Sequence, residues 1–447
     1  MSVAQWDDIV IGYGLAGACV ARALADAGRR VLIIERGRAV SDPPASHLRN
    51  RADYRNDPDG CFPAVDRYLT YLDPHAPAAA LPGAYTSAIV GGSGILWTNN
   101  CPRAAAGLER PEQLSEREWD EAYRQVEGYL DVRLEEFADS ARAARIRASL
   151  QPTLTDQGRA LSPLPLAGRR LEPQRIHYTA PADVLAAGSR PVTHLRGAVD
   201  RLELEGNQVS GVWVEGTLHT TRHVVLATGA MEAPLLLWRS GIAHPALGRH
   251  LSFHPVLLTQ VVLDQGQAAI TDTDPLPRLC IPPTTTHPWF VMVLRDTNPL
   301  PVDPSDRVVP SHRLVEIQAF GPIDPHPDNC MGVDGSGAVH FDVPIRAADQ
   351  ERLNAIERDV LGLIERLGRV RRGCEPCWSA PGTAHLMGSC RMGPDDGTAV
   401  TNRDGSLHGY EDVDIAGNAV IPTRLLVNPT LTALALAVHG QRSRVLV

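Results

Sequence analysis

The sequence predicts an α/β fold, α+β overall, that opens with a strand–helix–strand unit of the Rossmann type. A buried strand at residues 9–11 runs into a glycine-rich turn at 12–17, and a helical stretch follows at 18–27. A second apolar strand at 31–34 ends in Glu35. This order and spacing are those of a parallel β-α-β crossover, and the glycine-rich turn within it is typical of a dinucleotide site.

Each glycine of the turn has a physical role. Gly12 permits the tight turn, Gly14 lets backbone amides approach a pyrophosphate, and Gly17 lets the helix pack against the strand. The phosphate would lie at the positive end of the helix dipole. Glu35 is placed to accept hydrogen bonds from a ribose diol and would repel a 2′-phosphate, which disfavours NADP. The motif does not separate FAD from NAD. The expected site also includes Leu15, Ala16 and Arg36.

Length and composition describe an ordinary globular protein. A chain of 447 residues, 43% hydrophobic and 21% charged, fits two domains better than one. The formal net charge of -9 and the lack of a basic run argue against a nucleic-acid partner. No stretch approaches the about 18 apolar residues of a membrane span, and the N-terminus does not resemble a signal peptide. We therefore expect a cytoplasmic protein.

Two residue types narrow the chemistry. The sequence contains no lysine, which excludes a Schiff-base lysine and a Walker phosphate loop. The one close cysteine pair, Cys374 and Cys377, has neither a second pair nor nearby histidines. We interpret it as two thiols in a loop and expect no metal site.

Three further segments carry motifs. A strand at 85–90 enters the loop Gly91-Gly92, and a strand at 224–226 ends on a turn of small residues at 227–230. The last segment, at 384–393, contains His385 and ends in Arg-Met-Gly. It is followed by Ile-Pro-Thr at 421–423 and Asn-Pro-Thr-Leu-Thr at 428–432. The glycine loop can bring backbone amides to a cofactor, and the small-residue turn lets a helix start approach one.

Together these motifs resemble the glucose–methanol–choline (GMC) oxidoreductase superfamily, in order from residue 8 to about residue 440, and within it the pyranose-oxidase-like branch. The resemblance implies a discontinuous Rossmann-type FAD-binding domain at 1–110, 188–255 and 380–447. Residues 111–187 and 256–379 would form a substrate domain with a mainly antiparallel sheet and helices. The cofactor-binding positions that it adds are Gly91, Gly92, Leu96, Trp97, Thr98, Asn99, Ala198, Ala227, Thr228, Gly229, Asn418, Asn428 and Thr430.

The resemblance also implies the catalytic residues. His385 matches the family's catalytic histidine, and a neutral imidazole suits removal of a hydroxyl proton near neutral pH. Asn428 matches the partner that hydrogen-bonds the same substrate oxygen. An amide cannot take the proton, which leaves His385 as the base and Asn428 as the orienting group. For most of the 16 histidines, including His254, we expect a structural role.

One departure from the family pattern concerns the cofactor. Leu96 stands where the pyranose-oxidase-like branch has a histidine bonded covalently to the flavin, so we expect non-covalent FAD. Thr98 matches a threonine beside flavin N5 that affects oxygen reactivity, which favours an oxidase. The missing tether and a cytoplasmic setting favour a dehydrogenase. The electron acceptor, dioxygen or a quinone or redox partner, stays open.

The substrate is the least specified feature. The resemblance implies a small-molecule alcohol, a sugar or glycoside, and a chain this short leaves room for an open site. Two alternatives remain: a non-sugar or primary alcohol such as an aminocyclitol or a tailoring intermediate, and a catalytically silent FAD-binding protein. An amphipathic helix is expected at 115–134, with a capping box at Ser115 and Glu118 and with aromatic side chains that pack in the core. Residues 275–310 read as loops around one strand at 289–294, a natural place for a lid.

Overall fold

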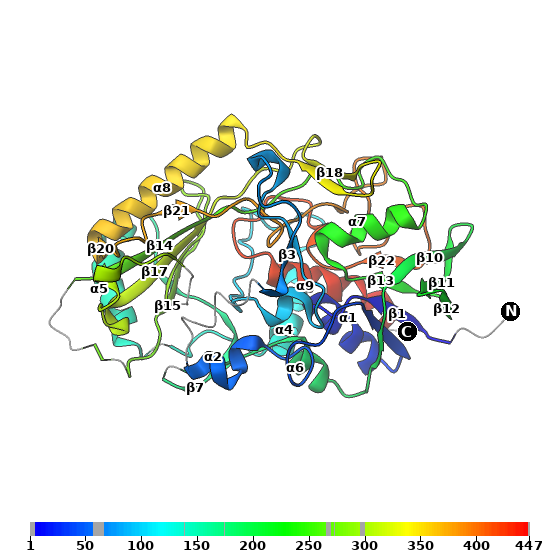
Figure 1. Cartoon of the computed structure of the whole chain (residues 1–447), viewed down its shortest axis with the longest axis horizontal. Coiled ribbons are helices and arrows are strands. Elements are labelled where there is room, and N and C mark those ends of the chain that lie inside the picture. The colour runs from blue at the N-terminus through cyan, green and yellow to red at the C-terminus, as the bar shows by residue number, and fades with distance from the viewer. Residues whose placement is uncertain are drawn as a thin grey trace.

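The computed structural model describes residues 5–56, 67–137, 139–173, 175–264, 270–271, 273–295 and 300–445. Two sheets lie at opposite ends of an elongated molecule, one beneath helix α8 (Ala347–Leu367) and the other beside helices α1 (Leu15–Asp26) and α7 (Gly229–Arg239) (Figure 1). None of the helices in the described part of the chain is long and apolar enough to span a membrane.

The first sheet is parallel and contains the predicted strand–helix–strand unit. Its order is β22 (Val413–Ile415), β13 (Val224–Leu226), β1 (Asp8–Ile11), β2 (Val31–Glu35) and β9 (Thr193–Arg196). The β1 and β13 strands are buried along their whole length, as their apolar runs predict. The β22 strand is also fully buried and was not predicted. The Rossmann-type unit is therefore confirmed. Helix α1 begins three residues earlier than expected, directly after Gly14.

The second sheet is mainly antiparallel, as expected. Its order is β20 (Gly368–Val370), β14 (Val256–Leu263), β17 (Leu314–Phe320), β16 (Val291–Leu294), β15 (Arg278–Ile281) and β6 (Ser162–Pro163), and β21 (Cys377–Trp378) pairs with β14. Side chains of α8 and of α5 (Ala141–Asp156) share one core with this sheet. The strand β15 was missed, because residues 275–310 were expected to hold a single strand.

The helix α4 (Glu116–Leu130) has the predicted capping box, and Trp119 and Tyr123 are fully buried, so their expected packing role is confirmed. It ends at Leu130 and not at residue 134, because Asp131 takes a left-handed φ of +51°. It packs against α9 (Thr430–Gly440), where the hydroxyl of Tyr123 lies 2.9 Å from that of Thr432.

This packing bears on the division into domains. Residues 111–187 were expected to belong to the substrate domain, yet α6 (Pro181–Ala186) contacts α1 and α4 contacts α9. In addition, the guanidinium of Arg22 in α1 lies 4.1 Å from the ring centroid of Tyr129 in α4. The sheets otherwise follow the predicted ranges. We therefore propose the same two domains with α4 and α6 moved to the FAD-binding one.

The remaining regular elements are short. A three-stranded antiparallel sheet, β10 (Val199–Glu205), β11 (Gln208–Val214) and β12 (Thr217–Thr220), packs against α7. Two further pairs are β3 (Thr70–Tyr71) with β4 (Tyr85–Thr86) and β18 (Cys330–Val333) with β19 (Val339–Asp342). A second three-stranded sheet has the order β5 (Val132–Arg133), β7 (Leu166–Glu172) and β8 (Arg175–Tyr178). The expected strand at 85–90 is thus only two residues long, and residue 89 instead forms a single bridge with Arg38.

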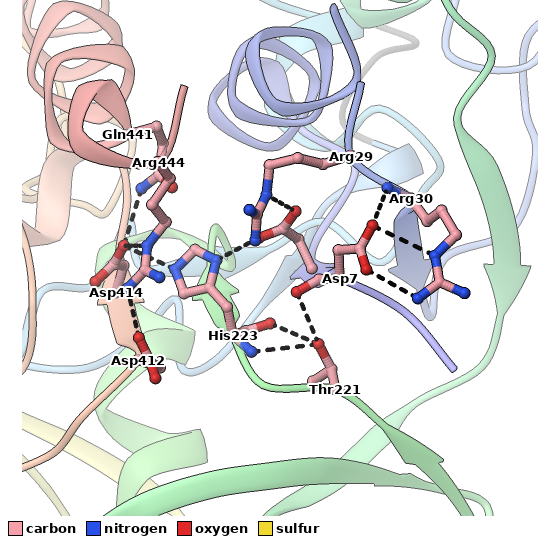
Figure 2. A network of polar contacts seen from close by, with 10 residues as sticks. Asp7, Arg29, Arg30, Thr221, His223, Asp412, Asp414, Gln441 and Arg444 are labelled. Carbon is pink, nitrogen blue, oxygen red and sulfur yellow. Dashed lines mark hydrogen bonds and ion pairs between the residues drawn. The ribbon is translucent and has the colours of Figure 1, made fainter. Parts of the chain in front are cut away.

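A buried polar network joins the first sheet at the end opposite the glycine turn (Figure 2). Nδ1 of His223 lies 2.7 Å from Asp8, and Nε2 lies 2.8 Å from Asp414. Arg29 forms an ion pair with Asp8, and Arg444 lies 3.7 Å from Asp414. Because these residues come from β1, β22 and the segment before β13, the network holds the strands in register.

Candidate active site

The glycine turn between β1 and α1 has the shape of a dinucleotide cradle. Gly12 has a φ of +103°, and a Cβ there would lie 2.6 Å from the carbonyl oxygen of Ala227. A Cβ on Gly17 would lie 2.0 Å from the carbonyl oxygen of Gly12, so the helix can approach the strand only without one. A Cβ on Gly14 would meet nothing within 4 Å. Gly14 therefore faces open space at the N-terminus of α1, where a pyrophosphate is favoured.

The residues at the end of β2 line the same region. The carboxylate of Glu35 accepts hydrogen bonds from the backbone N–H of Tyr13 at 2.9 Å and of Gly37 at 2.6 Å. It is thus held beside the glycine turn, with lone pairs left for a ribose diol. Arg36 forms a 2.6 Å ion pair with Glu232. Ala198 directly follows Gly197, whose backbone N–H donates to the carbonyl of Glu35 at 3.0 Å.

The second glycine loop lies against the first. Gly91 and Gly92 have φ angles of +96° and +52°, and a Cβ on Gly92 would lie 3.9 Å from Cα of Gly14. The loop continues as a 3-10 turn (Gly92–Ile95). Leu96 packs partly buried against the small core around Ile95.

The side chains after Leu96 mostly hold the loop to the protein. The indole of Trp97 donates to the carbonyl of Thr179 at 3.1 Å, and Asn99 donates to the same carbonyl at 2.8 Å. The hydroxyl of Thr98 accepts a 3.1 Å hydrogen bond from Asn100. Trp97 and Asn99 therefore hold the cofactor loop to the protein through these hydrogen bonds.

Two more loops reach the cradle. The backbone N–H of Ala227 donates to the carbonyl of Ile11 in β1 at 2.8 Å, and Gly229 starts α7 with a φ of +84°. Asn418 begins a 3-10 turn (Asn418–Val420) after Gly417, where a Cβ would lie 3.7 Å from Cβ of Ala16. Thr430 is the first residue of α9, which packs against α1.

The predicted catalytic residue His385 is in contact with a histidine that was expected to be structural. Nδ1 of His385 lies 3.1 Å from Nδ1 of His254, and the two rings meet edge to face. Nε2 of His254 lies 2.8 Å from the carbonyl oxygen of Leu425, three residues before Asn428. His254 thus contacts His385 and the segment that leads to Asn428. In the sequence, the only indication that His254 lies at the site was its position just before an apolar strand.

Burial controls the protonation of both histidines. It lowers the pKa of His385, with a further effect of neighbouring His254, to about 3. Burial likewise lowers the pKa of His254 to about 4. Both rings are therefore neutral near pH 7, and each carries one N–H. Among the residues that the structure describes, none forms a hydrogen bond with Nε2 of His385.

The site has the features that a dinucleotide requires. Within the described ranges, Oγ1 of Thr228 and Oδ1 of Asn428 are buried without a hydrogen-bond partner, as expected of groups that await a ligand. Thr228 adjoins the glycine cradle, which a Cβ on Gly14 would enter. The residues present therefore fit FAD. No group of three or more histidine, cysteine or acidic side chains in the described part of the chain could hold a metal ion.

A cavity of about 440 Å³ lies beside the segment that leads to Asn428, and neither His385 nor Asn428 is among its lining residues. Its lining includes Val427, next to Asn428, and Phe290, whose ring lies 6.2 Å from that of Phe320. The ring of Phe320 in turn lies 5.1 Å from that of His385. Most of the remaining lining is apolar and contains several prolines.

Comparisons with known proteins agree with this geometry. A family model described as FAD dependent oxidoreductase matches residues 7–400, and one described as GMC oxidoreductase matches residues 371–437. The C-glycoside 3-oxidase of Microbacterium trichothecenolyticum is 28% identical, over 98% of this chain and 96% of that one. The pyranose 2-oxidase of Tricholoma matsutake is 28% identical over 80% of this chain and 73% of its own length. The solved structure of pyridoxine 4-oxidase from Mesorbium loti has a TM-score of 0.63 at 20% identity and covers 98% of this chain and 99% of that one.

Proposed function

The chain belongs to the family of FAD-dependent oxidoreductases and carries the C-terminal region of the GMC oxidoreductases, and we propose that it oxidises a hydroxyl group of a sugar or glycoside to a carbonyl group. The observation that carries the proposal is a pair of polar atoms without protein partners among the described residues, Nε2 of His385 and Oδ1 of Asn428. The two relatives named for sugar and glycoside oxidation support this substrate class.

His385 and Asn428 divide the work of oxidation. FAD, when bound, supplies the two-electron acceptor that takes the hydride from the substrate carbon. Nε2 of His385 accepts the hydroxyl proton, so the carbon–oxygen single bond becomes a double bond as the hydride leaves. Asn428 hydrogen-bonds the same oxygen and orients it. Both electrons leave with the hydride, and the proton passes from His385 to solvent.

A glycoside with an apolar aglycone is the substrate that the cavity favours. A free monosaccharide offers mainly hydroxyl groups, whereas the lining beside Val427 and Phe290 is largely apolar. Burial of an apolar aglycone against such a lining contributes about 25 cal/mol per Å². The acceptor of the electrons in this proposal is dioxygen or a quinone.

Anaerobic bleaching of the flavin absorption band tests the proposal. We expect glycosides and sugars to bleach it, and His385→Ala to keep FAD but lose bleaching by about 100-fold or more. Bleaching by primary alcohols or aminocyclitols alone would assign the alternative substrate class, and unchanged bleaching in His385→Ala would refute the base. Dioxygen or a quinone is then added, and the one that restores the band is the acceptor.

A further inference from the structure

A continuous chain of hydrogen bonds leads from His385 to a buried carboxylate. His385 contacts His254 through their Nδ1 atoms at 3.1 Å, and Nε2 of His254 contacts the carbonyl of Leu425 at 2.8 Å. The N–H of Leu426 belongs to the same peptide group as that carbonyl, and it donates to the carboxylate of Glu109. The four groups come from segments that are far apart in the sequence.

The hydrogens in this chain have only one consistent arrangement. A carbonyl oxygen only accepts, so Nε2 of His254 must carry the hydrogen that faces Leu425. A neutral imidazole has one N–H, which leaves Nδ1 of His254 with a lone pair. Nδ1 of His385 must then donate to it, because two facing lone pairs would repel. Nε2 of His385 is left without a hydrogen, which is the state that a base requires.

We propose that His254 and Glu109 are positioning residues for the oxidation: His254 holds His385 in the tautomer with a bare Nε2, and Glu109 anchors the chain as its negative end. This inference rests on the proposed function, in which His385 is the base. It assigns a function in the reaction to two residues that touch neither substrate nor cofactor.

Glu109 is suited to its place because it is buried and ionised. Burial raises the pKa of Glu109 to about 6, against the hydrogen bonds that it accepts, so the carboxylate is charged near pH 7.5. It accepts from the N–H of Ala105 at 2.8 Å and of Val427 at 3.2 Å. The neighbouring cation is Arg110, whose charge favours the ionised form.

The negative charge of Glu109, at the end of the hydrogen-bond chain, stabilises His385 when it takes the proton. Every hydrogen in the chain points towards Glu109, so the peptide group and the His254 ring have their dipoles aligned with the positive charge that forms on His385. Fixed dipoles aimed at a developing charge stabilise it without reorganisation. The same contacts hold residues 426 and 427 directly before Asn428, and Thr423 adds a 3.1 Å hydrogen bond to the carbonyl of Glu109.

The tautomer can be measured without turnover. In holoenzyme labelled with ¹⁵N-histidine, two-bond ¹H–¹⁵N correlations distinguish a protonated ring nitrogen from a bare one, and His385→Ala identifies the His385 signals. We expect Nδ1 protonated and Nε2 bare in the wild type. In His254→Phe, which keeps an aromatic ring and lacks an acceptor, we expect a mixture of both tautomers.

Kinetics of anaerobic flavin reduction test the consequence. We expect His254→Phe to lower the rate of reduction by about 10- to 100-fold with little change in substrate affinity. His254→Asn, which keeps an acceptor near the position of Nδ1, should recover much of that loss. Glu109→Gln should lower the rate by about 10-fold, roughly 1.4 kcal/mol. The control Glu112→Gln changes an exposed carboxylate nearby and should leave the rate unchanged.

A protonated Nε2 on His385 in the wild type would overturn the inference, and this readout needs neither His254 variant to fold. Equal losses in His254→Phe and His254→Asn with an unchanged tautomer would also overturn it. The proposed function is tested separately: it fails if His385→Ala is reduced at the wild-type rate, or if only primary alcohols or aminocyclitols bleach the flavin.

Discussion

Nδ1 of His223 lies 2.7 Å from a carboxylate oxygen of Asp8, and both side chains are fully buried beneath the parallel sheet. Burial opposes the charged form of His223, but hydrogen bonds to Asp414 and Asp8 outweigh it and raise the pKa of His223 above 6.5. The pair therefore makes the stability of the fold depend on pH.

The first prediction is a loss of stability in the alkaline direction. A histidine whose pKa is raised on folding contributes stability that is complete below pH 6.5 and lost as the pH rises through its folded pKa. His223→Gln should remove this slope and cost about 1–3 kcal/mol near pH 6, because Asp8 and Asp414 lose the hydrogen-bond donor between them while their contacts with Arg29 and Arg444 remain. Thermal unfolding across the pH range measures both effects. His75→Gln, at an exposed position, is the control; an unchanged slope in His223→Gln would contradict the prediction.

The second prediction separates cofactor binding from folding. Gly14 has a φ of -79°, which any residue can adopt, and its Cβ would enter open space. Gly14→Ala should keep the unfolding temperature of the apoprotein while weakening FAD binding by about 10-fold or more, since a methyl group displaces the pyrophosphate.

Gly12→Ala is its matched comparison. Gly12 has a φ of +103° and lies against the carbonyl of Ala227, so a methyl group there should lower the stability of the apoprotein by about 1–3 kcal/mol. Flavin titration of both apoproteins measures FAD binding, and their thermal unfolding measures stability. Equal effects of the two substitutions on stability would refute the distinction.

The third prediction concerns attachment of the cofactor. Leu96 has an aliphatic side chain that packs against the core around Ile95 and cannot form a bond to a flavin. Acid precipitation of the holoenzyme should therefore release all FAD into the supernatant. Yellow colour that stays in the pellet would mean that another residue is bonded to the flavin.

The fourth prediction tests the aglycone cavity. Leu134 lines the cavity and is 50% exposed, so Leu134→Asp should leave the fold unchanged. Loss of its apolar contact should raise the KM for an aryl glycoside by about 5- to 30-fold, roughly 1–2 kcal/mol. The KM for the matching free sugar should stay the same. A parallel rise for both substrates would place the aglycone elsewhere.

Much of the FAD-binding domain was predictable from the sequence, because its determinants are local. Continuous apolar runs specify β1 and β2, and the glycine spacing specifies the turn between β1 and α1. The capping box at Ser115 fixed the start of α4 by hydrogen bonds within three residues. The order of four motifs then carried the family, the cofactor and the positions of His385 and Asn428.

The surroundings of the proposed catalytic histidine, His385, were decided by the tertiary structure alone. His254 contacts His385 across 131 positions of the sequence, and Glu109 reaches Leu426 across 317. The elements against which α4 packs could not be predicted from the sequence either, because an amphipathic face does not specify its partner. Hydrogen bonds between residues close in the sequence, and the period of apolar residues, can be predicted from the sequence. The contacts on which the tautomer proposed for His385 depends form only when segments far apart in the sequence fold together and bury these groups side by side.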